Sequence, residues 1–591
     1  MNTNPTSPDL PVAAFVDTDR RERLYAACPE LETIFRRYAE GQPMPGVSYG
    51  VVIDGELIFT HAFGLRNVAD HAPVTTETVF RIASMTKSFA ALAIMQLRNR
   101  GRLCLDEPAA TYVPELATLT YPTVDSSPIT VRDLLTMSAG WPQDDPWADR
   151  QLYRTDEELS TFYRAGVAWS NPPRQTFEYS NYGYMVLGRI ITNVAGLPAI
   201  DYITQEILQP LGMNATVWNA TDVAAERLAQ GYRWEDAMWK AEPMLPTGGD
   251  VAAFAGLFTS VPDLARWVAL FQGAWPPRDD TKGTLLRHSS LREMQQIGRA
   301  TTPSITLSHL GAAPLLQSGG YGYGLSISHN GQVETVGHGG GLPGFGSHMR
   351  WAPAYGIGVI VLANVTYARV HAACSEALQR LIAVSKVEPR RVPVAPALAS
   401  ARADILKLLT EWDDELAADL FADNFFLDLD RTHHLQELAE VKAQLGALQP
   451  DGPFVVENWL RGHWRMQGER GWCKVFITLA PTVPPRVQTL RLEITVQPSS
   501  VLQRLAKALA DLTAQPLQDE LAHLCAPDLD LAPLWDQVRL AHILCGPCTV
   551  DKVEAGDGST WATFRLTGPK ANVLLTLRVN AQGQLTEATF R

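Results

Sequence analysis

The chain has few features that would place it in a membrane or on a nucleic acid. No apolar run in its 591 residues is long enough to cross a bilayer. The formal net charge of -13 disfavours nucleic acid and anionic lipid as partners. Residues 1–19 lack a basic start followed by an apolar core, so we expect no secretory signal. The predicted protein is therefore cytoplasmic, with no nucleic acid and no membrane as partner.

Cysteine is scarce, with seven residues scattered between Cys28 and Cys548. An odd, scattered set disfavours a disulfide framework and is typical of a reducing compartment. No Cys/His group has zinc-like spacing, so no metal site is predicted. The pair Cys545 and Cys548 resembles a thioredoxin motif, but it follows a helix-like stretch and leads into a strand. A redox role is therefore the minor alternative.

The strongest chemical signal begins at Ser84 and Lys87, which lie three residues apart before a nearly all-apolar stretch ending at Leu97. That stretch predicts a buried helix. At a helix start, free N–H groups and the helix dipole favour negative charge, and a lysine three positions on returns to the same face. The spacing fits a serine nucleophile with a desolvated lysine as base. Alone, it also fits a capping serine beside an unrelated lysine.

A second motif is Tyr179–Ser180–Asn181, which precedes an apolar helix-like run from Met185 to Val194. A tyrosine near a lysine can have a lowered phenol pKa and can move protons. An asparagine two residues later can hydrogen-bond a substrate amide or orient the lysine. Without the first motif, this segment would be an ordinary loop before a helix.

A third motif, His338–Gly339–Gly340, lies in a glycine-rich segment before a buried strand predicted over Ile357–Ala363. Glycines let a backbone approach a ligand closely. An edge strand that carries the histidine can supply an N–H group to an oxyanion hole. The alternative is a flexible glycine loop.

Together, these motifs resemble the serine β-lactamase and penicillin-binding-protein superfamily, in particular its class C β-lactamase and D-aminopeptidase branch. The resemblance covers about residues 30–385 and includes family-like segments at 129–140, 210–213 and 256–260. It implies an α/β (α+β) catalytic domain, with an antiparallel sheet flanked by helices and an all-helical subdomain. It requires no metal or organic cofactor.

By this resemblance Ser84 is the nucleophile and Lys87 is the base that activates it. Tyr179 is the proton shuttle for the leaving group and the deacylating water, and Asn181 contacts the substrate amide and Lys87. The implied reaction is acylation of Ser84 followed by hydrolysis of the acyl-enzyme. The N–H groups of Ser84 and Gly341 would form the oxyanion hole, beside the substrate-binding residues His338, Gly339 and Gly340.

His338 is a departure from the β-lactamases and D-Ala-D-Ala carboxypeptidases, which usually carry a lysine there to bind a substrate carboxylate. Histidine is mostly neutral at pH 7, and His-x-Gly resembles the D-aminopeptidases and esterase-like members. We therefore expect a serine hydrolase of small or short-peptide amides, D-aminopeptidase-like or amidase-like. The alternatives are an esterase, a β-lactamase or carboxypeptidase, and a slow-turnover acylation sensor. If the neutral imidazole is needed, activity should fall as His338 becomes protonated.

An acidic, aromatic segment between the first two motifs predicts a pocket rim. Asp144, Asp145 and Trp147 are suited to receive a substrate ammonium through carboxylates and an indole face. The favoured alternative is that Asp149 and Arg150 pair with neighbours and hold a lid in place.

The catalytic region is predicted over 1–387, followed by a proline-rich linker over 388–400. Two α+β repeats, 401–498 and 499–591, are predicted from matching segments 105 residues apart, such as Glu415–Ala417 and Glu520–Ala522. Helices followed by strands resemble the cone-shaped nuclear-transport-factor-like fold. We expect the repeats to pack against the catalytic region or to join subunits in a homo-oligomer.

Overall fold

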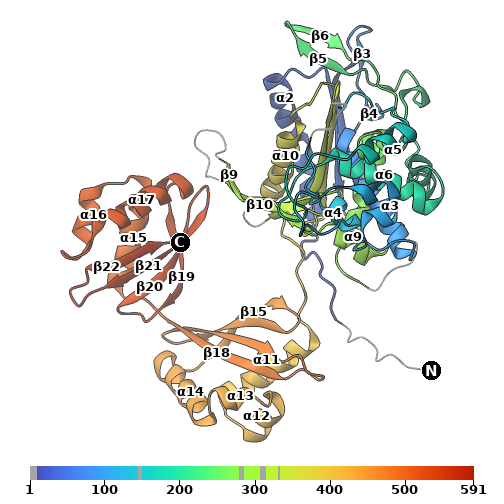
Figure 1. The fold of residues 1–591 in the computed structure, drawn as a ribbon. Helices are drawn as coiled ribbons and strands as arrows, with labels where there is room; N and C mark the ends of the chain where they lie inside the picture. The colour runs from blue at the N-terminus through green and yellow to red at the C-terminus, as the bar shows by residue number, and fades with distance from the viewer. Residues whose placement is uncertain (1–9, 144–148, 279–284, 307–314, 331–332) are drawn as a thin grey trace, which may run out of the picture. The chain divides into compact units, whose positions relative to one another are not determined.

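The computed structural model describes residues 10–143, 149–278, 285–306, 315–330 and 333–591. The chain divides into two compact units (Figure 1). The first, here called the catalytic unit, consists of residues 15–304 and 316–390. The second contains residues 391–591 together with short segments from earlier in the chain, and is here called the C-terminal unit.

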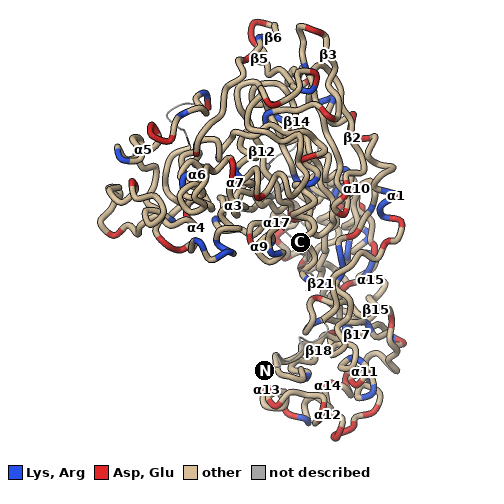
Figure 2. The backbone as a smooth tube through the Cα atoms, turned by 90° about the vertical axis from the view of Figure 1, so that its right-hand side faces the viewer, with Lys and Arg blue, Asp and Glu red and all other residues tan. Residues whose placement is uncertain are grey.

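The catalytic unit is built on an antiparallel sheet in the order β3-β2-β1-β14-β13-β12-β11-β10-β8. These strands are β1 (Gly46–Ile53), β2 (Glu56–Asn67), β3 (Ala72–Pro73), β8 (Arg299–Ala300), β10 (Leu315–Tyr321), β11 (Ser326–Asn330), β12 (Val333–Leu342), β13 (Phe345–Ala352) and β14 (Ile357–Ala363). The predicted strand over Ile357–Ala363 is confirmed as β14, and all seven of its residues are buried. Figure 2 shows few charged residues around β12 and β14.

Helices cover both faces of this sheet. One face packs against α1 (Arg20–Ala27), α2 (Leu31–Gly41) and α10 (Val370–Ser385), with a core that includes Val359 and Val361. The opposite face packs against a mainly helical region formed by α3 (Thr86–Asn99), α4 (Val131–Leu135), α5 (Asp156–Ala165), α6 (Asn181–Ala195), α7 (Ala199–Ile203), α8 (Val261–Gln272) and α9 (His288–Met294). Two short antiparallel pairs complete the unit: β4 (Phe80–Arg81) with β7 (Phe258–Thr259), and the hairpin of β5 (Tyr232–Glu235) with β6 (Met238–Ala241).

Helix α3 confirms the predicted buried helix, since every residue from Thr86 to Leu97 is buried. Its all-round apolar surface is what a helix in the centre of a domain requires. Within the described residues, no single helix is both long and apolar enough to span a bilayer; α6 and the helix that follows it pass such a test only as a pair bent by 79°.

The C-terminal unit has one eight-stranded sheet, with its strands in chain order. Its first half comprises α11 (Pro396–Thr410), α12 (Asp414–Leu420), α13 (Phe425–Asp428), α14 (Arg431–Leu445), β15 (Gln449–Asn458), β16 (Arg461–Gly468), β17 (Gly471–Leu479) and β18 (Val487–Val496). Its second half comprises α15 (Ser500–Ala514), α16 (Gln518–Leu524), α17 (Leu531–Cys545), β19 (Thr549–Gly556), β20 (Trp561–Thr567), β21 (Asn572–Val579) and β22 (Leu585–Phe590). The order of helices followed by strands therefore occurs twice.

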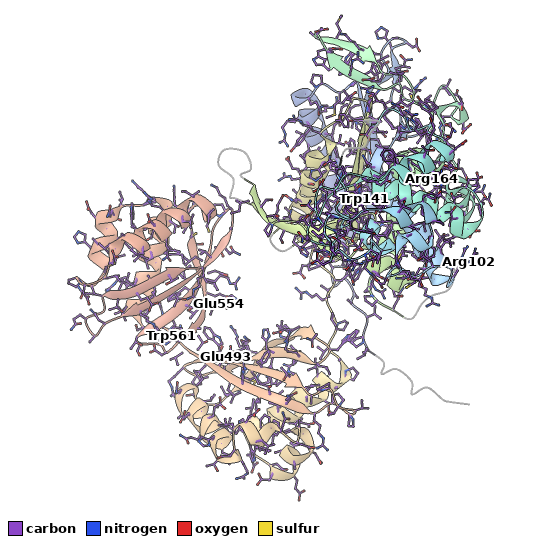
Figure 3. The ribbon with its side chains drawn as sticks, viewed as in Figure 1. Arg102, Trp141, Arg164, Glu493, Glu554 and Trp561 are labelled. Atoms are coloured by element: carbon purple, nitrogen blue, oxygen red, sulfur yellow. The ribbon has the colours of Figure 1, made fainter. Side chains whose placement is uncertain are left out.

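The two halves join where β18 and β19 pair in parallel, at Thr495 and Gly556. Figure 3 labels Glu493 on β18 and Glu554 on β19 near this junction. Alternate residues of β16 and β17 are buried, so one face of the sheet packs against a core and the other remains accessible. The predicted repeats thus share one sheet within one unit.

The predicted linker over 388–400 needs a correction, because it includes the first turn of α11. Pro396 is the first residue of that helix, where its missing N–H removes no helical hydrogen bond. A proline-rich composition therefore marked a helix start as well as a connection. The division between the units falls at residues 390 and 391.

Candidate active site

Ser84 lies in a short 3-10 turn, η2 (Ala83–Met85), that leads directly into α3. The preceding residue, Ala83, has φ of +49°, a left-handed conformation that is costly for a residue with a side chain. This turn puts the Ser84 hydroxyl beside the start of a buried helix. The free N–H groups and dipole of that helix favour an anion there.

Lys87 lies one helical turn after Ser84 and has no exposed surface. Its Nζ donates to Ser84 Oγ at 3.0 Å, to Asn181 Oδ1 at 2.8 Å and to the carbonyl oxygen of Phe254 at 3.2 Å. The amine is thus within direct proton-transfer distance of the serine hydroxyl.

The acceptors of Lys87 are held by a buried ion pair. Phe254 ends the turn η7 (Asp250–Phe254), and Asp250 at its start pairs with Arg189 of α6. Both side chains are almost completely buried. Because Asn181 begins the same helix, this ion pair links two of the elements that carry acceptors for Lys87.

Ser180 explains the shape of the second motif. Its side chain caps α6 by accepting from the N–H of Gly183 at 3.2 Å, so Tyr179 precedes the helix and Asn181 is its first residue. The Tyr179 phenol is hydrogen-bonded to Ser84, and its ring centroid lies 4.9 Å from Lys87 Nζ. The fold thereby brings Lys87 and Asn181, which are 94 positions apart in the sequence, to one site.

The prediction of a lowered pKa for Tyr179 is wrong. Burial raises the phenol pKa, and the nearby Asp149 carboxylate raises it further, while the hydrogen bond with Ser84 only partly opposes these effects. Tyr179 is therefore a neutral phenol at pH 7, able to donate a proton.

His338 is buried and neutral. Its Nε2 lies 2.9 Å from the Tyr321 hydroxyl, and its Nδ1 lies 2.6 Å from the carbonyl oxygen of Gly339. Since a carbonyl only accepts, Nδ1 carries the proton and Nε2 accepts from the phenol. Burial lowers the His338 pKa to about 3, and the positive charge of Lys87 contributes to the same shift.

The glycines of the third motif allow β12 to lie against the nucleophile turn. A side chain at Gly340 would overlap the carbonyl oxygen of Ile82, two residues before Ser84. The interpretation of this strand as an edge strand is wrong, because β12 pairs with both β11 and β13. However, β11 pairs only with the first half of β12, up to Gly337. The segment after Gly337 is thus open on that side.

The profile of the Beta-lactamase family matches residues 31–382, more than half of the chain. The chain belongs to the beta-lactamase family. It falls within the serine β-lactamase and penicillin-binding-protein superfamily, whose members include hydrolases.

Among curated family relatives, Protein flp of Staphylococcus aureus (strain MW2) is 28% identical over 340 residues, covering 57% of this chain and 63% of that protein. Unguisins hydrolase ungD' of Aspergillus campestris is 26% identical over 346 residues, covering 56% of this chain and 60% of that protein. This chain therefore spans less than two thirds of the length of these relatives.

Two solved structures are also similar. The octameric penicillin-binding protein homologue from Pyrococcus abyssi has a TM-score of 0.48 and 20% identity, covering 95% of this chain and 99% of that one. The penicillin binding protein from Bacillus halodurans has a TM-score of 0.46 and 24% identity, covering 59% of this chain and 99% of that one.

In this family member, Asp149 is a site residue that sequence reasoning had assigned only to pinning a lid. Its Oδ1 accepts from Asn181 Nδ2 at 3.4 Å, and its Oδ2 accepts from the Tyr367 hydroxyl at 3.2 Å. The Tyr367 ring in turn lies over Gly341, since a Cβ there would be 2.6 Å from the ring. The sequence signal that could have identified Asp149 was its position in a segment rich in Trp and Asp.

The remaining rim residues, Asp144, Asp145 and Trp147, lie outside the described residues. Arg150 pairs with the buried Glu242 at 3.4 Å, as the lid alternative expects. Within the described ranges, no group of three or more His, Cys, Asp or Glu side chains is arranged to hold a metal ion.

Proposed function

We propose that this family member hydrolyses amide bonds through an acyl-enzyme on Ser84, as an aminopeptidase or amidase for substrates with a free amino group. One observation carries the choice of substrate. A carboxylate, Asp149, contacts the asparagine that binds Lys87, and a neutral histidine occupies the position where carboxylate-binding relatives carry a lysine. The site is thus suited to an ammonium rather than a carboxylate.

Acylation begins when Lys87, after losing a proton to solvent to become a neutral amine, takes the proton of Ser84 across 3.0 Å, and the alkoxide attacks the substrate carbonyl. The developing oxyanion is stabilised by the N–H groups of Ser84 and Gly341. This role for Gly341 is supported by the packing of β12 against η2 and by the open side of β12 after Gly337.

The leaving nitrogen needs a proton before the bond breaks, and Tyr179 is the group that supplies it. Its raised pKa keeps the phenol protonated, and its hydrogen bond with Ser84 holds it beside the reacting atoms. The Lys87 ammonium then returns a proton to the phenolate. In deacylation the same groups act in reverse on a water molecule.

The Asp149 carboxylate and the half-exposed Tyr367 ring form one side of the substrate entrance in this proposal. A carboxylate next to an aromatic ring binds an ammonium by charge and by cation–π attraction. The D-configuration is the stereochemistry that the His-x-Gly motif implies. An esterase of the same fold uses the same acylation chemistry without needing Asp149.

For the C-terminal unit we infer a structural role, either in packing or in joining copies of the chain. Its two halves each place helices before an antiparallel meander, and this order supports the nuclear-transport-factor-like assignment. A cytoplasmic location and a small-molecule or short-peptide substrate complete the proposal.

The test compares D- and L-aminoacyl p-nitroanilides with their N-acetyl forms, beside p-nitrophenyl esters and a chromogenic cephalosporin. A fluorophosphonate probe reports whether Ser84 is reactive, with Ser84→Ala as the unlabelled control. We expect free-amine anilides to be hydrolysed and their N-acetyl forms to be poor substrates. Asp149→Asn should reduce this preference by about tenfold or more, as expected for loss of a charge-assisted contact. Equal turnover of both forms, or turnover of esters alone, would reject the amino-group proposal.

A further inference from the structure

A cavity of about 320 Å³ lies against strands β10 to β13 of the catalytic unit. Its lining also includes Gly339 and Tyr321, the partner of His338, so one end of the cavity borders the catalytic site. Its polar lining includes Arg350 and His348 of β13, His371 at the start of α10, and the hydroxyl groups of Ser326 and Ser328 on β11.

The alternation of β13 places the end of this cavity that Arg350 and His348 line on the sheet face opposite His338. Met349, the cross-strand partner of His338, belongs to the core shared with α3. The partners of Arg350 and His348 on β14 are Val359 and Val361, which belong to the core shared with α10. Successive residues of a strand point to opposite faces, so the Arg350 side chain and the His338 side chain lie on opposite sides of the sheet.

Arg350 is a buried cation with only neutral partners. The residue is 8% exposed. Its guanidinium group donates to Thr335 Oγ1 at 3.0 Å, His371 Nε2 at 3.2 Å and His348 Nε2 at 3.3 Å. Among the described residues, no carboxylate lies within 4.0 Å of its guanidinium. A buried charge without a counter-ion is costly, and a bound anion would offset that cost.

His348 adds a buried donor that has no hydrogen-bond partner. Because arginine cannot accept a hydrogen bond, His348 Nε2 is the acceptor, and the neutral ring carries its proton on Nδ1. Burial, followed by the charge of Arg350, holds the His348 pKa well below its usual range. Nδ1 is buried and has no hydrogen-bond partner. Gly339 leaves space beside this atom, since a Cβ there would lie 2.8 Å from it.

We propose that this cavity binds a small polar carboxylate, held by the guanidinium of Arg350 and the Nδ1–H group of His348. Both groups donate and neither accepts, which is the pattern a carboxylate requires. The site carries one positive charge, since both histidines accept from Arg350 and are neutral. A singly charged carboxylate balances that charge, whereas a phosphate dianion would leave one negative charge buried.

The remaining lining indicates what else the ligand carries. Ser326, Ser328 and Thr301 also line the cavity, and their hydroxyl groups favour a ligand with further polar groups, such as a hydroxy acid or an amino acid. A volume of about 320 Å³ is enough for a molecule of this size. The Arg350 and His348 donors lie on the α10 face of the sheet, away from Ser84, so we expect a free carboxylate there rather than the acyl group attached to Ser84.

The experiment is calorimetric titration of the full chain with lactate, with neutral lactamide as the matched ligand and inorganic phosphate as the competing anion. We expect one lactate per chain and no binding of lactamide. Arg350→Met should weaken lactate binding by tenfold or more, with Arg350→Lys in between because a lysine lacks the planar fork. Ser84→Ala should bind lactate as the wild type does, which separates this site from the catalytic one.

Three results would overturn the proposal. They are absence of lactate binding to the wild type, unchanged binding in Arg350→Met, and loss of binding in Ser84→Ala. Binding of phosphate in preference to lactate would reject a carboxylate ligand. Should Arg350→Met not fold, His348→Leu removes the second donor and keeps the charge of Arg350, and it should weaken lactate binding while lactamide remains unbound. None of these measurements depends on amide hydrolysis.

Discussion

The neutral His338 predicts a specific dependence of stability on pH. Its pKa in the folded protein is about 3, against an ordinary value of 6.5. The unfolded chain therefore takes up a proton at this histidine below about pH 6.5, while the folded chain does not. The contribution of His338 to stability is complete above pH 6.5 and is lost progressively as the pH falls toward 3.

The size of this effect follows from the difference between the two pKa values. A gap of about 3.5 pH units corresponds to a loss that approaches roughly 5 kcal/mol below pH 3, at about 1.4 kcal/mol for each unit. At pH 4.5 the loss is about 3 kcal/mol, because roughly two units of the gap have been crossed. This loss is a large fraction of the usual stability of a folded domain.

The assay is urea unfolding of the wild type and of His338→Gln at pH 7 and pH 4.5. Glutamine can still donate to the Gly339 carbonyl and accept from Tyr321, but it does not titrate. The advantage of the wild type over the variant should shrink by about 3 kcal/mol between the two pH values. Other titrating groups, including His348, are common to both proteins and cancel. An advantage of equal size at both pH values would refute the reasoning.

The same pKa changes the expected activity profile. Sequence alone suggested that activity would fall as His338 becomes protonated. With a pKa of about 3, that fall lies well below the range from pH 5 to 8. A flat profile over this range is therefore compatible with a requirement for the neutral imidazole.

Three further predictions concern the catalytic unit. Tyr179→Phe should lower kcat/KM for anilides by about 10²–10⁴-fold with little change in urea stability, and near-normal turnover would exclude its role as proton donor. Arg189→Met should destabilise the unit by about 3–5 kcal/mol in urea, because Asp250 stays buried without its partner, and Arg189→Met combined with Asp250→Leu should recover part of this loss. A loss below 1 kcal/mol in the single variant would contradict that account. Gly340→Ala should abolish fluorophosphonate labelling, because the new side chain clashes with the backbone of Ile82. Gly341→Ala should retain more labelling, because its side chain meets only the Tyr367 ring, which can move. Equal labelling of both variants would contradict the close packing of β12.

Several features of the fold were predictable from local patterns. The all-apolar run after Lys87 predicted α3, and the buried run over Ile357–Ala363 predicted β14, because both patterns depend on neighbouring residues alone. The repeated helix and strand order of the C-terminal unit was predictable for the same reason. The order and spacing of the three motifs likewise indicated serine acyl transfer.

Tertiary structure decided which distant residues interact and how far each titratable group is shielded from water. The direction of the Tyr179 pKa depends on burial and on Asp149, and that of His338 on burial and on Lys87. Neither environment can be read from a motif. The spacing of motifs determined the chemistry that the chain carries, whereas desolvation and the approach of charges determined the protonation state of each group.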